Sequence, residues 1–192
     1  MLGKKLVIPI PKKNKNRSNP SSYRPISLLP NIGKIFEKVI NDTLTTQSKE
    51  LNVIPENQYG FKSQHSTIHA INKLTSDINW ALNDRKCVEA CLIDLEKAFD
   101  TVWLDGLLFK LKNKKFPEHL VKIIWNMITN RSFAVVSEGK RSEREYTIYN
   151  GLQQGTINSP ILFNIYTCDI LHNFNLRNTG CSLIAFADDL IV

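Results

Sequence analysis

The sequence predicts an α+β fold, with helices packed on an antiparallel sheet. Short apolar runs bounded by turn residues, such as K-L-V-I-P-I at residues 5–10, are typical of strands. Longer segments, such as residues 32–51, carry apolar residues at helical spacing. These segments follow one another in mixed order, without an internal repeat or a long low-complexity linker, which favours the α+β class.

The first two predicted elements form a hairpin with a basic tip. Residues 5–10 are one strand, and residues 23–30 (Y-R-P-I-S-L-L-P) are the other, because a residue before proline avoids the helical region. The segment between them is rich in turn residues. Residues 3–17 contain six basic residues and no acidic one, which suits a polyanionic partner such as nucleic acid. A surface of solvated lysines is the alternative.

Two helices are predicted next. The first covers residues 32–51, and the second begins near Ser66, a residue type that is favoured at the N-cap. The loop P-E-N-Q-Y-G-F-K-S-Q-H-S separates them. The apolar positions are Ile32, Ile35, Phe36, Val39, Ile40 and Leu44 in the first helix and Ile68, Ile71, Leu74, Ile78 and Leu82 in the second.

The middle of the chain is predicted to contain a strand, two helical segments and a second hairpin. The strand is C-V-E-A-C-L-I-D-L at residues 87–95, residues 96–114 are helical with a break near Gly106, and residues 118–129 form the next helix. Residues 132–150 form a hairpin with a polar tip. The residues expected to pack inward from the 118–129 helix are Leu120, Ile123, Ile124, Met127 and Ile128.

The last part of the chain is predicted to be a helix followed by a pair of strands. Ser159 and Pro160 provide an N-cap and a first helical residue. The apolar residues of this helix are Ile161, Leu162, Ile165 and Ile170. The strand pair is S-L-I-A-F-A-D-D-L-I-V at residues 182–192.

Composition excludes several classes of protein. The chain is 42% hydrophobic, which is enough for one sizeable core or two small subdomains, and no stretch reaches the length of a membrane span. Its start is basic and polar, so secretion and a membrane partner are not expected. The net charge of +7 again suits nucleic acid. The four cysteines (Cys87, Cys91, Cys168 and Cys181) lack zinc-site spacing and are expected to be reduced, buried thiols of an intracellular protein.

Three carboxylates are candidate metal ligands. Asp94 ends a predicted strand, where its side chain can leave the core and face a cleft. Asp188 and Asp189 interrupt an apolar run, so a tight turn at Ala187–Asp188–Asp189 is expected to project them from a hairpin tip. Oxygen ligands suit Mg²⁺, and two such ions can activate a hydroxyl and stabilise a leaving pyrophosphate. An ordinary polar turn is the alternative.

A glycine-bracketed loop and an aromatic residue are further candidates. Gly151 and Gly155 flank a polar loop that leads into a helix N-terminus, an arrangement that favours contact with a phosphate or a base. Phe99 lies five residues after Asp94 and could form the wall of a pocket. An ordinary capped loop and a core aromatic residue are the alternatives.

Five blocks of this sequence together resemble reverse transcriptases. L-I-D-L-E-K-A-F-D-T-V-W, G-L-Q-Q-G-T-I-N-S-P-I-L-F-N-I-Y and F-A-D-D-L-I-V are similar, in order and spacing, to three palm blocks of these polymerases. The segments that begin K-L-V-I-P-I-P and E-N-Q-Y-G-F-K are similar to the fingers blocks. The likeness is strongest to non-LTR retrotransposons of the jockey-like, LINE-type group and covers nearly the whole chain. It implies a right-hand polymerase fold, with fingers at about residues 1–86 and a palm with a fingers insertion at about residues 87–192.

The resemblance also implies roles for the carboxylates. Asp94 and Asp188 match the main metal ligands of the family, and Asp189 matches a less direct third carboxylate. The backbone carbonyl of Leu95 is expected at a metal as well. The implied cofactor is a pair of Mg²⁺ ions, with Mn²⁺ as a possible substitute.

The residues implied to bind the substrate lie in three other segments. Phe99 falls on the steric-gate position, which excludes a ribose 2′-hydroxyl. Gln154 and Gly155 match the block that lines the nucleotide pocket, and Arg24 matches the fingers arginine that covers the triphosphate. The implied reaction is RNA-templated DNA synthesis, so the implied partners are an RNA template, a DNA primer and deoxynucleoside triphosphates. The implied location is the nucleus or cytoplasm.

The chain departs from the family pattern at several points. Gln153 stands where proline is usual, Lys62 replaces an arginine, and Lys12 or Lys13 matches only loosely an assisting fingers lysine. The sequence ends at Val192, so we expect a partial chain without the thumb and endonuclease regions of a longer polyprotein. A non-catalytic nucleic-acid-binding remnant is the alternative function. A metal-dependent nuclease explains the carboxylates but not the fingers blocks.

Overall fold

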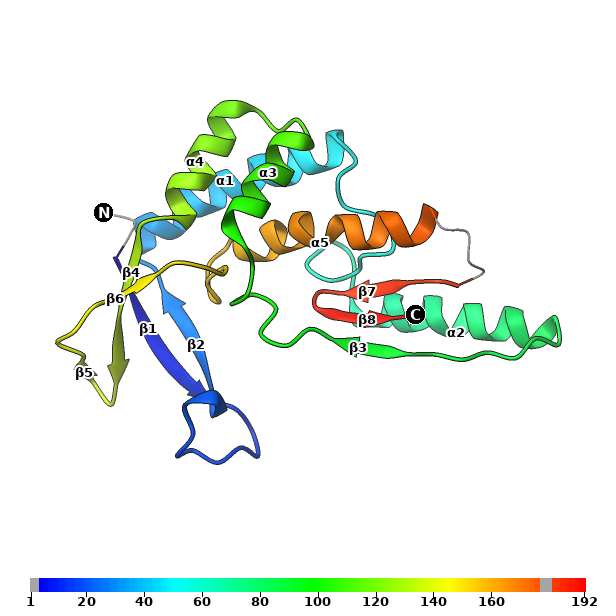
Figure 1. Cartoon of the computed structure of the whole chain (residues 1–192), viewed down its shortest axis with the longest axis horizontal. Coiled ribbons are helices and arrows are strands. Elements are labelled where there is room, and N and C mark those ends of the chain that lie inside the picture. The colour runs from blue at the N-terminus through cyan, green and yellow to red at the C-terminus, as the bar shows by residue number, and fades with distance from the viewer. Residues whose placement is uncertain (1–3, 177–180) are drawn as a thin grey trace.

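The computed structural model describes residues 4–176 and 181–192, which form two sheets flanked by helices (Figure 1). The larger sheet has the order β2-β1-β4-β5, and β6 also pairs with β4. Its strands are β1 (Lys4–Pro11), β2 (Tyr23–Leu28), β4 (Arg131–Ser137), β5 (Lys140–Arg141) and β6 (Tyr146–Ile148). Both predicted hairpins are therefore confirmed.

One pairing in this sheet was not predicted. Strand β1 runs antiparallel to β2 but parallel to β4, with Lys4 opposite Ser132 and Val7 opposite Val135. A parallel pair needs a long connection, and local sequence patterns do not indicate which distant segments will meet. This pairing joins the two hairpins into one mixed sheet.

The smaller sheet carries the Asp-Asp hairpin. It is antiparallel in the order β3-β8-β7, with β3 at Leu92–Asp94, β7 at Ile184–Phe186 and β8 at Asp189–Ile191. The strand predicted at residues 87–95 is thus much shorter, although Cys91 and Val192 exchange two further backbone hydrogen bonds. The acidic residues 94 and 189 lie at the same end of neighbouring strands.

The helices α1 (Asn31–Glu50), α2 (Thr67–Asn83), α3 (Leu104–Asn113), α4 (Glu118–Ile128) and α5 (Ser159–Leu176) complete the fold. Helix α5 crosses the centre and packs against α1 and α3, while α2 lies beside the smaller sheet (Figure 1). The predicted starts of α1, α2, α4 and α5 agree with the structure to within about two residues. No helix in the described ranges has both the length and the apolar character needed to cross a bilayer.

The main core lies where α3, α4 and α5 meet. It includes Leu107, Leu111, Ile124 and Ile165, each at most 1% exposed. The predicted inward residues of α4 agree with this core: Leu120, Ile124 and Ile128 are buried, and Ile123 and Met127 are partly buried against it. The buried Val121 was not among the predicted residues. The apolar stripes of α1 and α2 do not agree, because several members are more than half exposed: Ile32, Ile35, Val39, Ile68, Ile71 and Leu82.

The helix predicted over residues 96–114 is wrong in its first half. Residues 95–103 form a series of turns, and α3 begins at Leu104. The backbone carbonyls of Phe99 and Val102 accept hydrogen bonds from Leu152 and Gly151, so tertiary contacts use groups that a helix would need. Gly106 does not break α3 but lies within it.

The prediction that all four cysteines are buried holds only for Cys168. Cys87, Cys91 and Cys181 are exposed. Burial, together with the neighbouring carboxylate of Asp169, raises the pKa of the Cys168 thiol to about 12. Because the thiolate is the reactive form, Cys168 should be inert at ordinary pH.

Alkylation should therefore divide the cysteines. At about pH 8.5, near the ordinary pKa of a thiol, iodoacetamide should modify Cys87 and Cys91 rapidly and leave Cys168 unmodified until urea is added. Peptide mass spectrometry measures this directly. Equal labelling of Cys168 in the folded chain would contradict its burial in α5.

Candidate active site

The Asp-Asp pair lies at a two-residue hairpin turn. Phe186 pairs with Asp189 across the hairpin, so Ala187 and Asp188 form the turn and Asp189 is the first residue of β8. The expected hairpin tip is confirmed, except that Asp189 belongs to a strand. Asp94, the last residue of β3, lies directly opposite Asp189, which places their Cβ atoms about 5 Å apart.

The three carboxylates influence one another. Partial burial raises the pKa of Asp189, and repulsion from Asp188 and Asp94 raises it further. Oxygen donors without nitrogen or sulfur are the set that a hard cation prefers, and a cation would relieve this repulsion. Among the described residues, however, no three acidic, histidine or cysteine side chains converge closely enough to form a metal cluster. The donor chemistry fits a hard cation, and the joint binding of a cation by Asp94 and Asp188 that the sequence indicates stays a prediction.

Five of the predicted site residues line a single cleft of about 310 Å³. They come from four segments: β2, the turns before α3, the loop before α5 and the hairpin tip. These residues are Arg24, Phe99, Gln154, Gly155 and Asp188. Asp94, Leu95 and Asp189 are not part of the lining. The side chain of Leu95 packs against the core, and the role of its backbone carbonyl stays a prediction. The lining of the cleft thus includes both a cation and a carboxylate.

Aromatic packing holds Phe99 in the wall of this cleft. Its ring stacks on Phe163 of α5 with centroids 4.7 Å apart, and Phe61 meets it edge-on at 5.8 Å. Phe61 also lines the cleft. Phe99 is therefore both a core aromatic residue and a pocket wall, the two roles that the sequence left open.

The loop before α5 is held against the larger sheet. The backbone N–H of Ser27 in β2 donates to the carbonyl of Gln154 at 2.8 Å. Gly155 has φ +93°, and a Cβ there would lie 2.8 Å from the carbonyl oxygen of Ser27. Glycine is therefore required at this position both by the left-handed backbone and by the close approach of β2.

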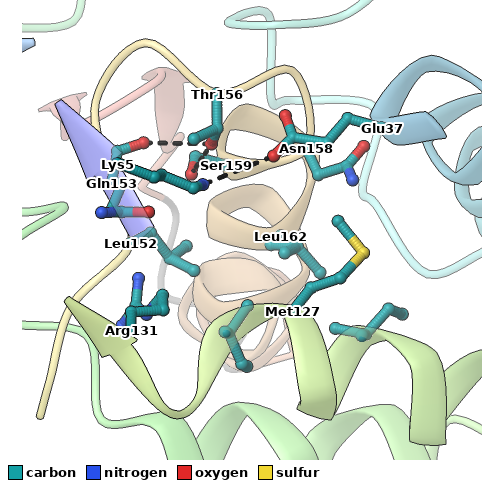
Figure 2. Close-up of a pocket in the computed structure, with 12 residues that line it drawn as sticks. Lys5, Glu37, Met127, Arg131, Leu152, Gln153, Thr156, Asn158, Ser159 and Leu162 are labelled. Atoms are coloured by element: carbon teal, nitrogen blue, oxygen red, sulfur yellow. Dashed lines mark hydrogen bonds and ion pairs between the residues drawn. The ribbon is translucent and has the colours of Figure 1, made fainter. Parts of the chain in front are cut away.

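Charged side chains beneath this loop were not found from the sequence (Figure 2). Glu37 of α1 accepts the backbone N–H of Ile157 at 2.8 Å and lies 3.5 Å from the ammonium of Lys5. Arg131 of β4 donates to the carbonyl of Gly151 at 2.8 Å. All three charged residues are at most 8% exposed. They fix both ends of the loop that carries Gln154.

These buried charges surround a cavity of about 20 Å³, which has room for about one water molecule. Nε of Arg131 and the side-chain amides of Gln153 and Asn158 find no hydrogen-bond partner within the described residues. Desolvation lowers the pKa of Lys5, despite Glu37, and lowers that of Arg131 to about 10. The cavity is a polar junction between the larger sheet and α5.

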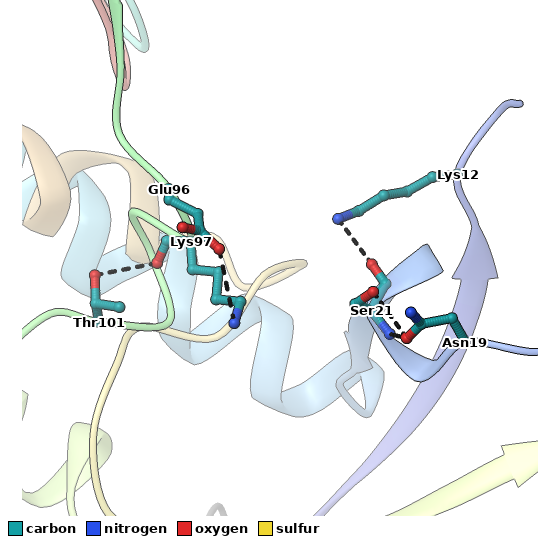
Figure 3. A network of polar contacts seen from close by, with 6 residues as sticks. All are labelled: Lys12, Asn19, Ser21, Glu96, Lys97 and Thr101. Carbon is teal, nitrogen blue, oxygen red and sulfur yellow. Dashed lines mark hydrogen bonds and ion pairs between the residues drawn. The ribbon is translucent and has the colours of Figure 1, made fainter. Parts of the chain in front are cut away.

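The predicted basic tip contributes less to the cleft than expected. The ammonium of Lys12 donates to the carbonyl of Ser21, in the 3₁₀ turn η1 (Pro20–Ser22), at 3.1 Å (Figure 3). Lys13 is exposed. Burial raises the pKa of Asp100, opposed by Lys97, by Lys12 and by a hydrogen bond with the Gln154 side chain. Asp100 is thus a neighbour of Gln154 that the F-D-T-V-W motif contained but that sequence reasoning did not select.

Comparisons with known proteins agree with this arrangement. Residues 10–192 match the family model described as reverse transcriptase (RNA-dependent DNA polymerase). The chain is 35% identical over 191 residues to the RNA-directed DNA polymerase from mobile element jockey of Drosophila funebris. It is 33% identical over 191 residues to the probable RNA-directed DNA polymerase from transposon BS of Drosophila melanogaster. These alignments cover 97% and 96% of the chain but only 20% of each relative.

Solved structures show the same fold at low sequence identity. A telomerase from Candida albicans, in complex with a fragment of telomeric RNA, superposes with a TM-score of 0.68 at 12% identity, over 98% of this chain and 37% of the telomerase. An apo telomerase of Candida tropicalis truncated from its C-terminal domain gives a TM-score of 0.67 at 16% identity, over 99% of this chain and 43% of the telomerase. The right-hand polymerase fold and the jockey-like resemblance are confirmed. The chain belongs to the reverse transcriptase (RNA-dependent DNA polymerase) family.

Proposed function

We propose that this chain forms the fingers and palm of an RNA-directed DNA polymerase of a non-LTR retrotransposon. The observation that carries this proposal is the single cleft lined by Arg24, Phe99, Gln154, Gly155 and Asp188. This set of side chains suits a deoxynucleoside triphosphate. The cation suits its phosphates, the aromatic wall and the glycine loop suit its sugar and base, and the carboxylate suits a metal ion bound to the phosphates. Fingers at about residues 1–86 and palm at about residues 87–192 remain part of the proposal.

Each residue of the cleft has a positioning task. The Arg24 guanidinium holds the triphosphate, because its planar fork matches phosphate oxygens. The loop at Gln154 and Gly155 supports the sugar and base. Asp94 and Asp188 hold divalent cations, for which we propose Mg²⁺, since this ion takes one or two carboxylates and completes its shell with phosphate oxygens and water. The chemistry that ions held by Asp94 and Asp188 would supply is activation of the primer hydroxyl and charge neutralisation at the departing pyrophosphate.

The proposed partners are an RNA template and a DNA primer in addition to the deoxynucleotide. The chain carries a net charge of +7, and basic side chains bind a phosphate backbone with little sequence preference. The protein supplies position and charge rather than covalent chemistry.

A primer-extension assay tests the function. Because the chain spans 20% of its curated relatives, the assay compares the 192-residue chain with a chimera in which residues 10–192 replace the matching segment of the jockey polymerase. With a poly-rA template, a short DNA primer and Mg²⁺, the chimera should incorporate deoxythymidylate. A folded chimera that binds the primer–template but does not extend it, while intact jockey polymerase does, would support the non-catalytic remnant instead.

Phe99→Val should relax selection against ribonucleotides. The ring of Phe99 lines the cleft, and in this role it occupies the space that a 2′-hydroxyl would need. We expect the ratio of ribonucleotide to deoxynucleotide incorporation to rise roughly 10- to 100-fold, the range that pocket contacts of this size provide. Competition between the two triphosphates measures this ratio. Phe109→Val, at a 63% exposed position on α3, is the matched control, and an unchanged ratio in Phe99→Val would remove Phe99 from this role.

A further inference from the structure

The 57–60 segment (Asn57–Gly60) lies along β7 and its turn. The backbone N–H of Tyr59 donates to the carbonyl of Ala185 at 2.8 Å, and that of Ala185 donates to the carbonyl of Asn57 at 2.9 Å. Gln58 and Ala185 form a parallel bridge. The segment therefore acts as a short additional strand at the β7 edge of the smaller sheet.

The Gln58 side chain continues this contact into the hairpin turn. It is 1% exposed. Its Oε1 accepts the backbone N–H groups of Ala187 at 3.0 Å and of Gly60 at 2.8 Å. Its Nε2 faces the carbonyl oxygen of Ala187 at 3.4 Å. One amide group thus satisfies both backbone polar groups of Ala187.

Ala187 needs this support because its backbone is unfavourable. Its φ is +61°, a left-handed conformation that costs a residue with a Cβ about 1–2 kcal/mol. Two-residue hairpin turns of this type normally use glycine, asparagine or aspartate. Ala187 is also 8% exposed, so an unbonded N–H would carry the cost of a buried polar group. The turn therefore depends on an external partner.

Gly60 and Asn164 keep the 57–60 segment close enough to the hairpin turn for Gln58 to reach Ala187. A Cβ on Gly60 would lie 2.1 Å from the backbone nitrogen of Ala187, so only glycine permits this approach. The amide of Asn164 in α5 donates to the carbonyl of Gly60 at 2.9 Å. The hairpin turn is thereby connected to the central helix.

We propose that Gln58 is a positioning residue for Asp188. Asp188 follows Ala187 directly, so the peptide that Gln58 fixes sets the direction in which the Asp188 carboxylate leaves the turn. Without Gln58, Ala187 can relax to a negative φ and carry Asp188 away from Phe99 and Gln154 across the cleft. This inference rests on the proposed function, because it assigns Gln58 a task only if Asp188 binds a cation.

Gln58→Leu tests the inference with two readouts besides activity. The first is amide hydrogen exchange, which should accelerate at Ala187 and Gly60 but not at Ala185, whose partner is a backbone carbonyl. The second is Mn²⁺ binding followed by electron paramagnetic resonance. Its affinity should fall roughly 10- to 100-fold, as is usual when a group that orients a metal ligand is removed. In the extending chimera, kcat should fall with little change in the KM for primer–template.

Control variants separate positioning from general loss of stability. Val53→Ala removes packing from a position of the main core that is 0% exposed and lies outside the 57–60 segment and the hairpin. It should lower the melting temperature without changing Mn²⁺ affinity. Gln58→Glu keeps an acceptor for both N–H groups and should preserve the slow exchange of Ala187. If Gln58→Leu does not fold, this variant decides, and Ala187 exchange as fast as that of an unprotected amide would overturn the inference.

The outcomes for Gln58 and for the site itself are distinguishable. If the wild-type chain binds Mn²⁺ no better than Asp188→Asn does, the proposed metal site fails, whatever Gln58→Leu shows. If wild-type binding depends on Asp188 but Gln58→Leu binds Mn²⁺ as tightly as the wild type, the positioning role of Gln58 is overturned and the proposed function stands.

Discussion

Asp188→Asn is expected to abolish primer extension while leaving the chain folded. The substitution removes a negative charge from the cleft and keeps the size of the side chain. Loss of one such electrostatic contact in a preorganised site typically lowers kcat by roughly 10²–10³-fold. Asp94→Asn should have a similar effect, because Asp94 of β3 lies directly opposite Asp189 of β8, next to the hairpin turn that carries Asp188.

Although Asp188→Asn should lose activity, its free energy of unfolding should not fall. Partial burial and repulsion from Asp188 and Asp94 raise the pKa of Asp189, so removing one carboxylate relieves repulsion in the metal-free chain. Urea unfolding without divalent ions should show a free energy of unfolding that is unchanged or slightly higher. Asp42→Asn, at an exposed α1 residue paired with Lys38, is the matched control for extension. Retained extension in Asp188→Asn would refute the catalytic assignment.

Glu37→Gln should produce the largest loss of stability. The carboxylate lies 3.5 Å from the ammonium of Lys5, and both side chains are about 5% exposed. The amide can still accept the N–H of Ile157, but Lys5 is left as a buried cation without its anion and is repelled by nearby Arg131. Breaking a buried pair in this way costs about 3–5 kcal/mol, which urea unfolding followed by tryptophan fluorescence can measure.

A double variant tests whether the uncompensated charge of Lys5 causes the loss of stability in Glu37→Gln. Lys5→Met combined with Glu37→Gln removes both partners, and exchanging a buried pair for apolar groups is often nearly neutral. The double variant should therefore recover at least half of the loss. Glu50→Gln, at an exposed residue near the end of the same helix, should change stability by less than about 0.5 kcal/mol. A double variant no more stable than Glu37→Gln alone would contradict this explanation.

Much of the fold was predictable because its signals are local. The Asp-Asp pair within an apolar run predicted a hairpin tip, and the structure forms the turn at Ala187–Asp188. Both sequence blocks that carry Phe99 and Gln154 were recognised, and the structure brings these residues into one cleft with Arg24. Such features depend on short motifs whose spacing reflects one element or one turn.

The unpredicted features depend on contacts between distant segments. The buried side of α1 consists of Gly33, Glu37, Ile40, Leu44 and Ser48, so only Ile40 and Leu44 of its predicted apolar positions are buried. Periodicity cannot find Glu37 on a buried face, because the partners that permit its burial are Lys5 and the backbone of Ile157, far away in the sequence. The role of Gln58 could not be predicted for the same reason, because its partner Ala187 lies 129 positions further along the chain.

That separation also determines when the site can form during synthesis. Chains tend to fold from the N-terminus as they emerge from the ribosome, and contacts between distant positions are slow to form. Asn57–Gly60 are synthesised long before β7. Until the hairpin is made, the polar groups of this segment that later bond to the hairpin must bind water or other partners. Helices α1, α3 and α4 can already be assembled at that stage. The order of synthesis therefore makes the acidic hairpin form later than the helices that precede it in the chain.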